Sequence, residues 1–585
     1  MSDQGAPAKR TTLQALAVFG ERRTLVMIVL GFAAGLPNLL IFDTLSLWLR
    51  EAGLSLEVIA FFSLATLAYS LKFLWAPLVD RTKVPILTGL LGHRRSWMLV
   101  CQVLIMIGLW LVAGGNPATN LGAMALFAVF VGFSSATQDI VIDAWRIEVA
   151  DQDRQGPMAT AYQWGYRIAI IVSGVGPLLL AEAYSWRVSY AVMAALMLVG
   201  MAAVVAAPRE QQHVVRPIHA DGTPSRPALE VPELVLRLAL AVIGALVLGC
   251  GLAGRADLIT ATLNAIGAGT LSPGLTAAFT APSYGVFVQL GAIIIGATII
   301  FLAVRPIPGF KTRPGVFLNA ALGDPFREFF GRYGKLAALI LATICLYRIS
   351  DFVLNVMNPF YADLGFTRPQ IAEVRKVFGV VASMVGVSLG GYCVIRLGLM
   401  RALVMGAFAG PLSNLIFAWL ATQGPSLFAL TVAIGVDNVA AGFSGTCLIA
   451  YMSSLTGHGF TATQYALFSS LYALPGKIIA SQSGRIVEGA ARAADEGPLS
   501  FMRGLFANMP AGSYAQAMER SNVSPAGLGA GYITFFLYST VIGTIGVVLA
   551  IWVARRSPTL EDPEDPTSTL PQDVDPETPQ TRQTT

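Results

Sequence analysis

The chain has 585 residues, of which 55% are hydrophobic and 12% are charged, and its formal net charge is +5 at pH 7. A soluble domain carries about twice that charged fraction, so the composition excludes a soluble globular protein and indicates one that crosses a membrane many times. The net charge is therefore not a sign of nucleic-acid binding. The five cysteines lie in apolar segments and the four histidines are scattered, which argues against a disulfide framework and a metal site.

Apolar windows of about 20 residues, the length that crosses a bilayer, recur along the chain. They predict an all-α membrane protein with about fourteen membrane helices. The first window is a full-length span with no cleavage site after it, so we expect it to remain as the first helix. The windows cover residues 24–49, 57–79, 97–114, 121–145, 158–182, 187–207, 232–252, 285–304, 336–360, 370–394, 398–420, 426–450, 461–487 and 530–554.

Most lysine and arginine residues that flank these spans cluster on one side of the membrane. They precede the first span, follow the second, cluster at residues 305–335 and follow the last, whereas the opposite loops at 115–119 and 422–425 carry none. Cytoplasmic loops of membrane proteins are enriched in these residues. We therefore expect both termini to be cytoplasmic.

Weak internal repeats divide the chain into two halves. Residues 51–59 are similar to 363–371, and Ala159–Tyr162 is similar to Ala462–Tyr465. Parallel repeats of this kind are typical of one large transporter superfold. We expect a cytoplasmic segment 1–23, a six-helix bundle 24–207, a linker with two extra helices 208–335, a second six-helix bundle 336–554 with a periplasmic insert at 490–529, and a disordered tail 555–585.

Lys72 lies inside the second span, and an ammonium in hydrocarbon costs at least a few kcal/mol. It precedes Asp80 by eight residues, and Asp139 precedes Arg146 by seven, so a rise of ~1.5 Å per residue places Lys72 and Asp139 at similar depth. The spacing predicts a Lys72–Asp139 pair. Asp143, one turn from Asp139, repels it and makes a proton site possible. The alternative is a structural ion pair, with Asp143 merely at the interface.

Further charges lie near the middle of the membrane. Arg167 has no acid within a helical turn, so it requires a partner on another helix, a substrate or water. Arg348 and Asp351 are i, i+3 neighbours that either neutralise each other or serve a site. Asp437 and Asn438 together supply acceptors and donors suited to sugar or amide groups.

Polar and aromatic residues accompany these charges. We expect Asp43, near the outer end of the first span, to contact substrate or gate the outer side; a helix-packing hydrogen bond is the alternative. Aromatic faces flanked by hydrogen-bonding groups suit sugar rings, although interfacial anchoring is the alternative for each aromatic residue. Residues of this kind are Tyr162, Gln163, Gln464 and Tyr465, and Lys477 is a further charge in the 461–487 span.

Several strings are similar to one known family. They are Leu30–Pro37, Tyr69–Arg81, Gly92–Trp97, Ala136–Arg146, Gly386–Gly391 and Phe460–Leu467. Together they resemble the peptide–acetyl-coenzyme A–drug transporter family of the major facilitator superfamily, and more closely its bacterial AmpG-type muropeptide permeases. Asp80, Arg81, Arg94 and Arg95 look like a divergent form of the superfamily's loop between helices two and three, and would latch the cytoplasmic side.

The resemblance implies two six-helix bundles with two extra helices. It also implies proton-driven import of N-acetylglucosaminyl-anhydro-N-acetylmuramic acid, with or without stem peptide, across the bacterial inner membrane, for peptidoglycan recycling and β-lactamase induction. We expect Lys72, Asp139 and Asp143 to couple protons, and Arg167 to bind a substrate carboxylate. We expect no cofactor, no enzymatic activity, no nucleic acid and a monomer. The other expected substrate contacts are Asp43, Tyr162, Gln163, Arg348, Asp351, Asp437, Asn438, Gln464 and Tyr465.

Two readings compete with this one. A carrier of the same fold would transport another large anion, such as a coenzyme A thioester or a siderophore. A membrane-embedded transferase is the other class, although such enzymes usually show a catalytic module or an acidic metal cluster. The sequence departs from the family in the long insert before the last span and in the poor match around residues 346–360.

Overall fold

The computed structural model describes residues 18–53, 67–117, 119–151, 154–210, 226–265, 267–281, 284–306, 312–457, 459–472, 483–510 and 512–556. Within these ranges the chain is helical and has no strand, which confirms the all-α prediction. Twelve described helices are long and apolar enough to cross a membrane. The other two expected spans, 57–79 and 461–487, include residues outside the described ranges. Lys477 is one of these residues, so its predicted position in the membrane lies outside what the structure describes.

The first bundle is held together by close backbone contact between its first and fifth spans. A Cβ atom at Gly165 would lie 1.8 Å from the carbonyl oxygen of Ile28, and one at Gly31 would lie 2.2 Å from that of Tyr162. Only glycine permits this approach. The bundle comprises α2 (Arg22–Leu39), α3 (Leu45–Glu51), α5 (Leu67–Leu71), α6 (Ala76–Arg81), α7 (Leu87–Leu91), α8 (His93–Gly114), α9 (Leu121–Glu148), α10 (Gln155–Ala183) and α11 (Trp186–Ala206), with the short segments η1 (Val18–Gly20), η2 (Leu40–Thr44) and η4 (Lys72–Leu74).

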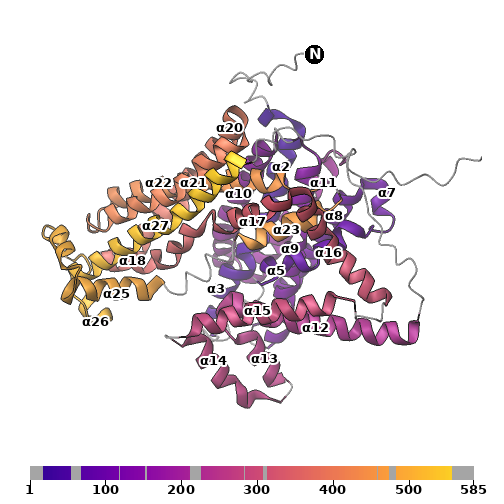
Figure 1. The fold of residues 1–585 in the computed structure, drawn as a ribbon, viewed down its shortest axis with the longest axis horizontal. Coiled ribbons are helices and arrows are strands. Elements are labelled where there is room, and N and C mark those ends of the chain that lie inside the picture. The colour runs from indigo at the N-terminus through magenta and orange to yellow at the C-terminus, as the bar shows by residue number, and fades with distance from the viewer. Residues whose placement is uncertain are drawn as a thin grey trace, which may run out of the picture.

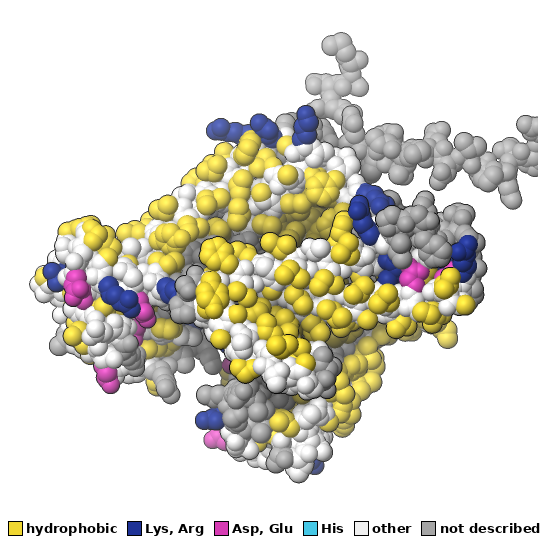
Figure 2. Space-filling view, turned by 60° about the horizontal axis from the view of Figure 1, so that its bottom comes forward, with side chains coloured by type: hydrophobic (Ala, Val, Ile, Leu, Met, Phe, Trp, Pro, Cys, Tyr) yellow, Lys and Arg dark blue, Asp and Glu magenta, His cyan; other side chains and the backbone are white. Residues whose placement is uncertain are grey.

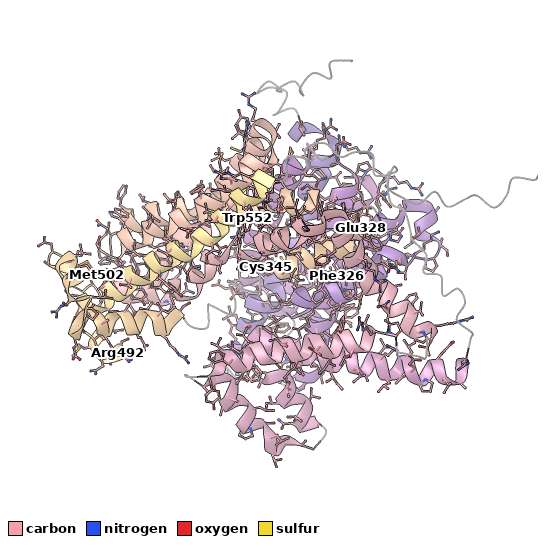
Figure 3. The ribbon with its side chains drawn as sticks, in the orientation of Figure 1. Phe326, Glu328, Cys345, Arg492, Met502 and Trp552 are labelled. Carbon is pink, nitrogen blue, oxygen red and sulfur yellow. The ribbon has the colours of Figure 1, made fainter. Side chains whose placement is uncertain are left out.

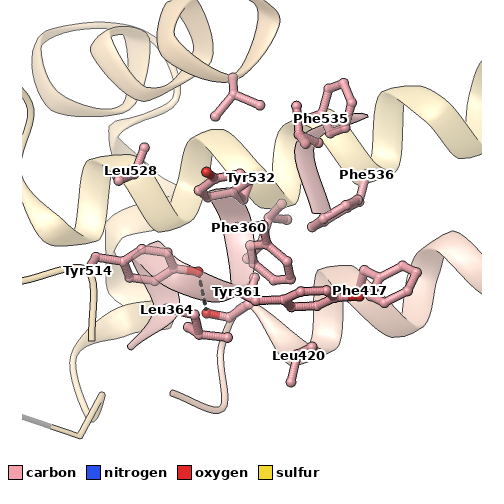
Figure 4. Packing of buried hydrophobic residues seen from close by; sticks show 14 of the residues in the cluster. Phe360, Tyr361, Leu364, Phe417, Leu420, Tyr514, Leu528, Tyr532, Phe535 and Phe536 are labelled. Atoms are coloured by element: carbon pink, nitrogen blue, oxygen red, sulfur yellow. Dashed lines mark hydrogen bonds between the residues drawn. The ribbon is translucent and has the colours of Figure 1, made fainter. Parts of the chain in front are cut away.

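The second bundle packs around a cluster of aromatic rings. Phe360 lies 4.9 Å from Tyr532 and 5.0 Å from Phe536 between ring centroids, and Figure 4 shows these rings between α27 and α18. The helices are α17 (Ala337–Leu346), α18 (Met357–Leu364), α19 (Arg368–Glu373), α20 (Gly379–Leu397), α21 (Leu399–Leu420), α22 (Leu427–Ser454), α23 (Thr461–Leu471), α25 (Ser483–Glu496), α26 (Ala517–Ser521) and α27 (Pro525–Arg556), with η8 (Ile349–Val356), η9 (Val374–Phe378) and η10 (Ser500–Phe506).

Two long antiparallel helices, α12 (Pro227–Ala253) and α15 (Gly285–Val304), separate the bundles in sequence. They pack through glycines: a Cβ atom at Gly296 would lie 2.4 Å from the Leu248 backbone nitrogen. Small residues allow helices to approach closely in a membrane, where no hydrophobic force favours their association. The connection between them contains α13 (Asp257–Ala265), η6 (Gly269–Leu271) and α14 (Ser272–Thr280).

A helix that the sequence analysis did not predict follows this hairpin. Residues 313–333 were expected to be linker, but they form α16 (Arg313–Tyr333), which leads through η7 (Gly334–Leu336) into α17. Its charged residues pair at helical spacing, as in Asp324–Arg327 and Glu328–Arg332. The apolar windows of the prediction respond to hydropathy alone and therefore missed this amphipathic helix.

The two bundles meet at one end, which we call the basic face because Arg22, Arg81, Arg94 and Arg556 lie at the helix ends there. Away from it the bundles diverge, toward α3 in the first and toward α18, α25 and α26 in the second (Figure 1). The outer surface in one view is largely hydrophobic, with arginine and lysine at its edges (Figure 2). Such a surface suits contact with lipid.

The close approach of α2 and α10 can be tested by substitution. We expect Gly165→Ala to lower the stability of the detergent-solubilised protein by about 1–3 kcal/mol, because the added methyl group forces the two backbones apart. Gly122→Ala is the matched control, since no atom lies within 4 Å of the added group. Thermal unfolding of the two variants provides the comparison. Equal melting temperatures would contradict the prediction.

Candidate functional site

A buried charge cluster joins the two bundles at the basic face. Arg94 is fully buried, and its Nη2 lies 2.7 Å from Asp80 Oδ1 and 2.6 Å from Glu148 Oε1. Asp80 also accepts hydrogen bonds across the interface, from Thr463 N at 2.9 Å and Thr463 Oγ1 at 2.6 Å. The N-H groups of Ala462 and Thr463 belong to the first turn of α23, where backbone donors have no intrahelical partner. An acid of the first bundle therefore caps a helix of the second.

The other arginines expected to latch this face behave differently from each other. Arg81 Nη2 donates to the Ala320 carbonyl at 3.1 Å and lies 3.3 Å from Asp324 Oδ2, so it contacts α16. Arg95 donates to the carbonyls of Leu91 and Ala207, both in the first bundle. The hydrogen bonds of Arg95 to described residues thus stay within the first bundle, and its part in latching the cytoplasmic side stays a prediction.

Arg146 is a cross-bundle residue that the sequence analysis used only as a depth marker. Its Nη1 donates to Ser453 Oγ at 2.9 Å, and its guanidinium lies over the Tyr465 ring at 5.2 Å. Gln464 donates to the Pro325 carbonyl at 2.9 Å and accepts from Gly457 N at 2.6 Å. Tyr465 and Gln464, which were expected to bind substrate, are thus buried in the closed basic face. Helical periodicity does not reveal which neighbouring element covers a face.

Lys72, Asp139 and Asp143 come together but do not form the expected direct pair. Lys72 is close enough to attract both carboxylates, yet it makes no ion pair with either of them. Instead, Asp143 Oδ1 pairs with Arg146 at 3.4 Å, and the buried Asp139 Oδ1 has no hydrogen-bond partner among the described residues. The depth estimate assumed an unbroken α-helix, whereas Lys72 begins the 3-10 segment η4.

A polar site lies between the bundles, where side chains of α10, η8 and α22 come close together. Gln163 Nε2 donates to Thr446 Oγ1 at 2.8 Å across the interface. A Cβ atom at Gly445 would lie 3.4 Å from Arg348 Nη1 and 3.9 Å from Gln163 Oε1. Arg348 itself pairs with Asp351 at 2.5 Å, which confirms that these neighbours neutralise each other. Tyr162, one residue before Gln163, is half-buried.

Arg167 is one helical turn beyond Gln163 on α10 and is half-buried. Among the described residues it has neither an ion pair nor a hydrogen bond, and the like-charged Arg348 of the other bundle is close enough to repel it. A half-buried guanidinium without an acid is expensive unless water or an anion satisfies it. Arg167 therefore provides a positive charge between the two bundles, beside the neutralised Arg348–Asp351 pair.

A second polar group lies on the second bundle alone. Asp437 Oδ1 accepts from Ser413 Oγ at 3.1 Å, whereas Asn438 donates to the Ile434 carbonyl of its own helix at 2.9 Å. Arg375, which the sequence analysis missed, attracts Asp437, hydrogen-bonds Asn358 and lies 5.8 Å from the centroid of the Tyr361 ring. Arg375 was missed because it lies near the start of the predicted span 370–394, where an arginine usually contacts the membrane interface.

Several of these charges sit where a membrane helix departs from regular α-helix. Asp43 is exposed in the π-helical η2, Lys72 begins the 3-10 segment η4, Arg348 and Asp351 flank the start of the 3-10 segment η8, and Arg375 is in the π-helical η9. Such irregular turns are frequent at functional sites. Backbone groups freed there are tolerated in a membrane only where protein or water satisfies them. This pattern was not visible in the sequence.

Among the described residues, no group of three or more histidine, cysteine, aspartate or glutamate side chains could hold a metal ion. The arrangement offers instead a closed basic face, a buried carboxylate pair beside a lysine, and arginines between two bundles. These features suit the binding and passage of a polar anion through an apolar surrounding.

Comparison with known proteins shows which family the chain is similar to. The model of the Major Facilitator Superfamily matches residues 51–296. The putative transporter AmpG 4 of Rickettsia conorii is 28% identical over 473 residues, which cover 80% of this chain and 91% of the relative. The anhydromuropeptide permease of Escherichia coli K12 is 28% identical over 478 residues, covering 81% and 76%.

The fold also has a counterpart among solved structures. A solved structure of the proton:xylose symporter XylE aligns with a TM-score of 0.50 at 10% identity, covering 93% of this chain and 96% of the symporter. At that identity the likeness concerns the fold alone. The partial match to the family model, the relatives that extend over most of both chains and the shared fold make this chain similar to the major facilitator superfamily and, within it, to AmpG-type transporters.

Proposed function

We propose that this protein imports anhydro-muropeptides across the bacterial inner membrane. The relatives named AmpG and anhydromuropeptide permease support this substrate class. The structural observation that carries it is Arg167, a half-buried cation between two bundles with no acidic partner among the described residues. Anhydro-muropeptides supply a carboxylate, either on the muramic lactyl group or on the stem peptide.

Orientation follows from the distribution of positive charge. We infer that the basic face is cytoplasmic, because cytoplasmic ends of membrane helices are enriched in arginine and lysine. Both termini are then cytoplasmic. With Asp80 capping α23 there, the protein is closed toward the cytoplasm and its bundles diverge toward the periplasm (Figure 1). Transport proceeds as the bundles rock and expose the polar residues between them to each side in turn.

Substrate binding uses groups of both bundles. Arg167 binds the carboxylate as a charge-assisted, bidentate pair. Gln163 and the Arg348–Asp351 pair lie beside it and hydrogen-bond acetamido or hydroxyl groups. Asp437, Asn438 and Asp43 provide further polar contacts, and the ring of Tyr162 offers a flat apolar face for a sugar.

Proton coupling is assigned to Asp139 and Asp143 with Lys72. A carboxylate in apolar surroundings is stable when it is protonated or paired with a cation. Lys72 is near Asp139 but makes no ion pair with it. A small movement of η4 would bring the lysine into contact with Asp139, and the ammonium would then replace the proton as the group that neutralises the carboxylate. The coupled import of cell-wall fragments would then serve peptidoglycan recycling and the induction of β-lactamase, and the protein would act as a monomer.

The carboxylate assignment is tested by Arg167→Gln. Loss of a charge-assisted hydrogen bond costs about 1.5–3 kcal/mol, so we expect the KM for labelled anhydro-disaccharide to rise about 10- to 100-fold. Arg492→Gln is the control, because its side chain is 68% exposed on α25. Uptake is measured in vesicles with a proton gradient. An unchanged KM would remove Arg167 from the site, and uptake of a coenzyme A thioester or siderophore instead would reassign the substrate.

The proton assignment is tested by separating accumulation from exchange. We expect Asp139→Asn to abolish accumulation driven by a pH gradient but to retain the exchange of labelled for unlabelled substrate, because the amide cannot carry a proton across. Asp151→Asn is the control, since Asp151 is 76% exposed. Full accumulation in Asp139→Asn, in Asp143→Asn and in the double variant would refute the assignment.

A further inference from the structure

Helix α16 lies across the junction of the two bundles at the basic face. Its middle contacts the first bundle through Arg81, which donates to the Ala320 carbonyl at 3.1 Å and pairs with Asp324 at 3.3 Å. The Arg81 guanidinium also lies over the Phe460 ring of the second bundle at 5.6 Å. Arg81 thus connects α6, α16 and the segment that leads into α23.

The C-terminal half of α16 contacts the second bundle. Gln464 Nε2 donates to the Pro325 carbonyl at 2.9 Å and to Glu328 Oε2 at 2.5 Å. Phe329 is 3% exposed, and its ring lies 5.3 Å from that of Phe468 on α23. Arg332, paired with Glu328, donates to the Thr456 carbonyl at 3.3 Å. Figure 3 shows Glu328 and Phe326 on this helix beside the centre of the molecule.

The N-terminal end of α16 is attached to the hairpin of α12 and α15. Thr312, the residue before the helix, donates from Oγ1 to Glu233 Oε1 at 2.6 Å. Arg237, buried beside it, donates to the carbonyls of Ala303 and Arg305 at 2.6 and 2.7 Å. These bonds satisfy the last carbonyls of α15. The hairpin therefore holds the start of α16 in place.

We propose that α16, anchored by the α12–α15 hairpin, is a strap that holds the basic face closed and must leave Arg81 before that face opens. The strap is residues 313–333. It continues through η7 into α17 and so belongs covalently to the second bundle. Rocking of the bundles separates α6 from α23, and the strap follows the second bundle because its C-terminal end continues into α17 and contacts α23. The two contacts of Arg81 with Ala320 and Asp324 are consequently those that break.

The strap adds to the cap that Asp80 forms on α23 but differs from it in strength. Asp80 and Arg94 are fully buried, whereas the Asp324 side chain is 36% exposed. A partly exposed ion pair contributes modestly and weakens with salt. The strap therefore adjusts the balance between closed and open basic faces rather than determining it alone. This gives the two extra helices a function in the transport cycle that does not require contact with substrate.

The test measures how often the basic face opens. In a variant lacking the five native cysteines, Thr160→Cys reports opening, because residue 160 is fully buried between α10 and α20. We expect Asp324→Asn to raise its rate of labelling by a membrane-permeant maleimide about two- to fivefold, the range for loss of a partly exposed ion pair. High salt reduces the difference between the two proteins. Asp151→Asn, an exposed acid of the first bundle, leaves the rate unchanged.

A double-mutant cycle assigns the effect to the Arg81 contact. Arg81→Gln also raises the labelling rate, and adding Asp324→Asn to it produces no further increase, because the two residues share one interaction. Additive effects, or a labelling rate in Asp324→Asn equal to that in Asp151→Asn, would overturn the proposal. The assay contains no substrate, so its result is independent of whether the protein carries muropeptides.

A second experiment keeps the strap attached. Cysteines placed at residues 81 and 324 are joined by a short, reducible cross-linker in the same cysteine-free background. We expect uptake to stop on cross-linking and to return after reduction, and labelling at residue 160 to follow the same course. Cross-linked protein that labels at the uncross-linked rate would show that α16 does not need to leave Arg81.

Discussion

The closed basic face depends on one buried carboxylate. Asp80 is tied to Arg94 within its own bundle and to the first turn of α23 in the other. A buried charge of this kind is tolerated only when its hydrogen-bonding capacity is satisfied, and removing one partner typically costs about 3–5 kcal/mol. Glu148 balances the charge of Arg94, so the carboxylate is held in position before α23 arrives. In the proposed transport cycle, the two bundles would part and rejoin without rearranging the first bundle.

Glycine contacts explain why each bundle can move as a unit. Gly165 and Gly31 bring α2 and α10 into backbone contact, and Gly386 does the same for α20 and α22, where a Cβ atom would lie 2.1 Å from the Val439 carbonyl oxygen. Between bundles, side-chain hydrogen bonds such as that of Gln163 with Thr446 lie beside close packing, because a Cβ atom at Gly391 of α20 would lie 2.1 Å from Thr160 Oγ1 of α10. Tight packing within each bundle resists deformation.

Several predictions from the sequence agree with the structure and others do not, for identifiable reasons. The spans were predictable because each must be apolar over about 20 residues whatever its neighbours. The i, i+3 pair of Arg348 and Asp351 was predictable because it is local. The direct pairing of Lys72 with Asp139 was predicted wrongly, because Lys72 begins the 3-10 segment η4 and the depth estimate assumed a regular α-helix. The sequence analysis gave Arg95 a latching role and gave Gln464 and Tyr465 a substrate-binding role. It could not take into account which elements pack over these side chains.

The sequence by itself determined that this is a many-span membrane protein with buried charges and two extra helices, because hydropathy is a property of each segment alone. The tertiary structure decided which charges meet. Asp80 and Thr463 are far apart in the chain but in contact, Arg167 faces Arg348 across the two bundles, and α16 bridges Arg81 and Gln464. Such pairings depend on how helices are placed beside one another, and no local pattern encodes that placement.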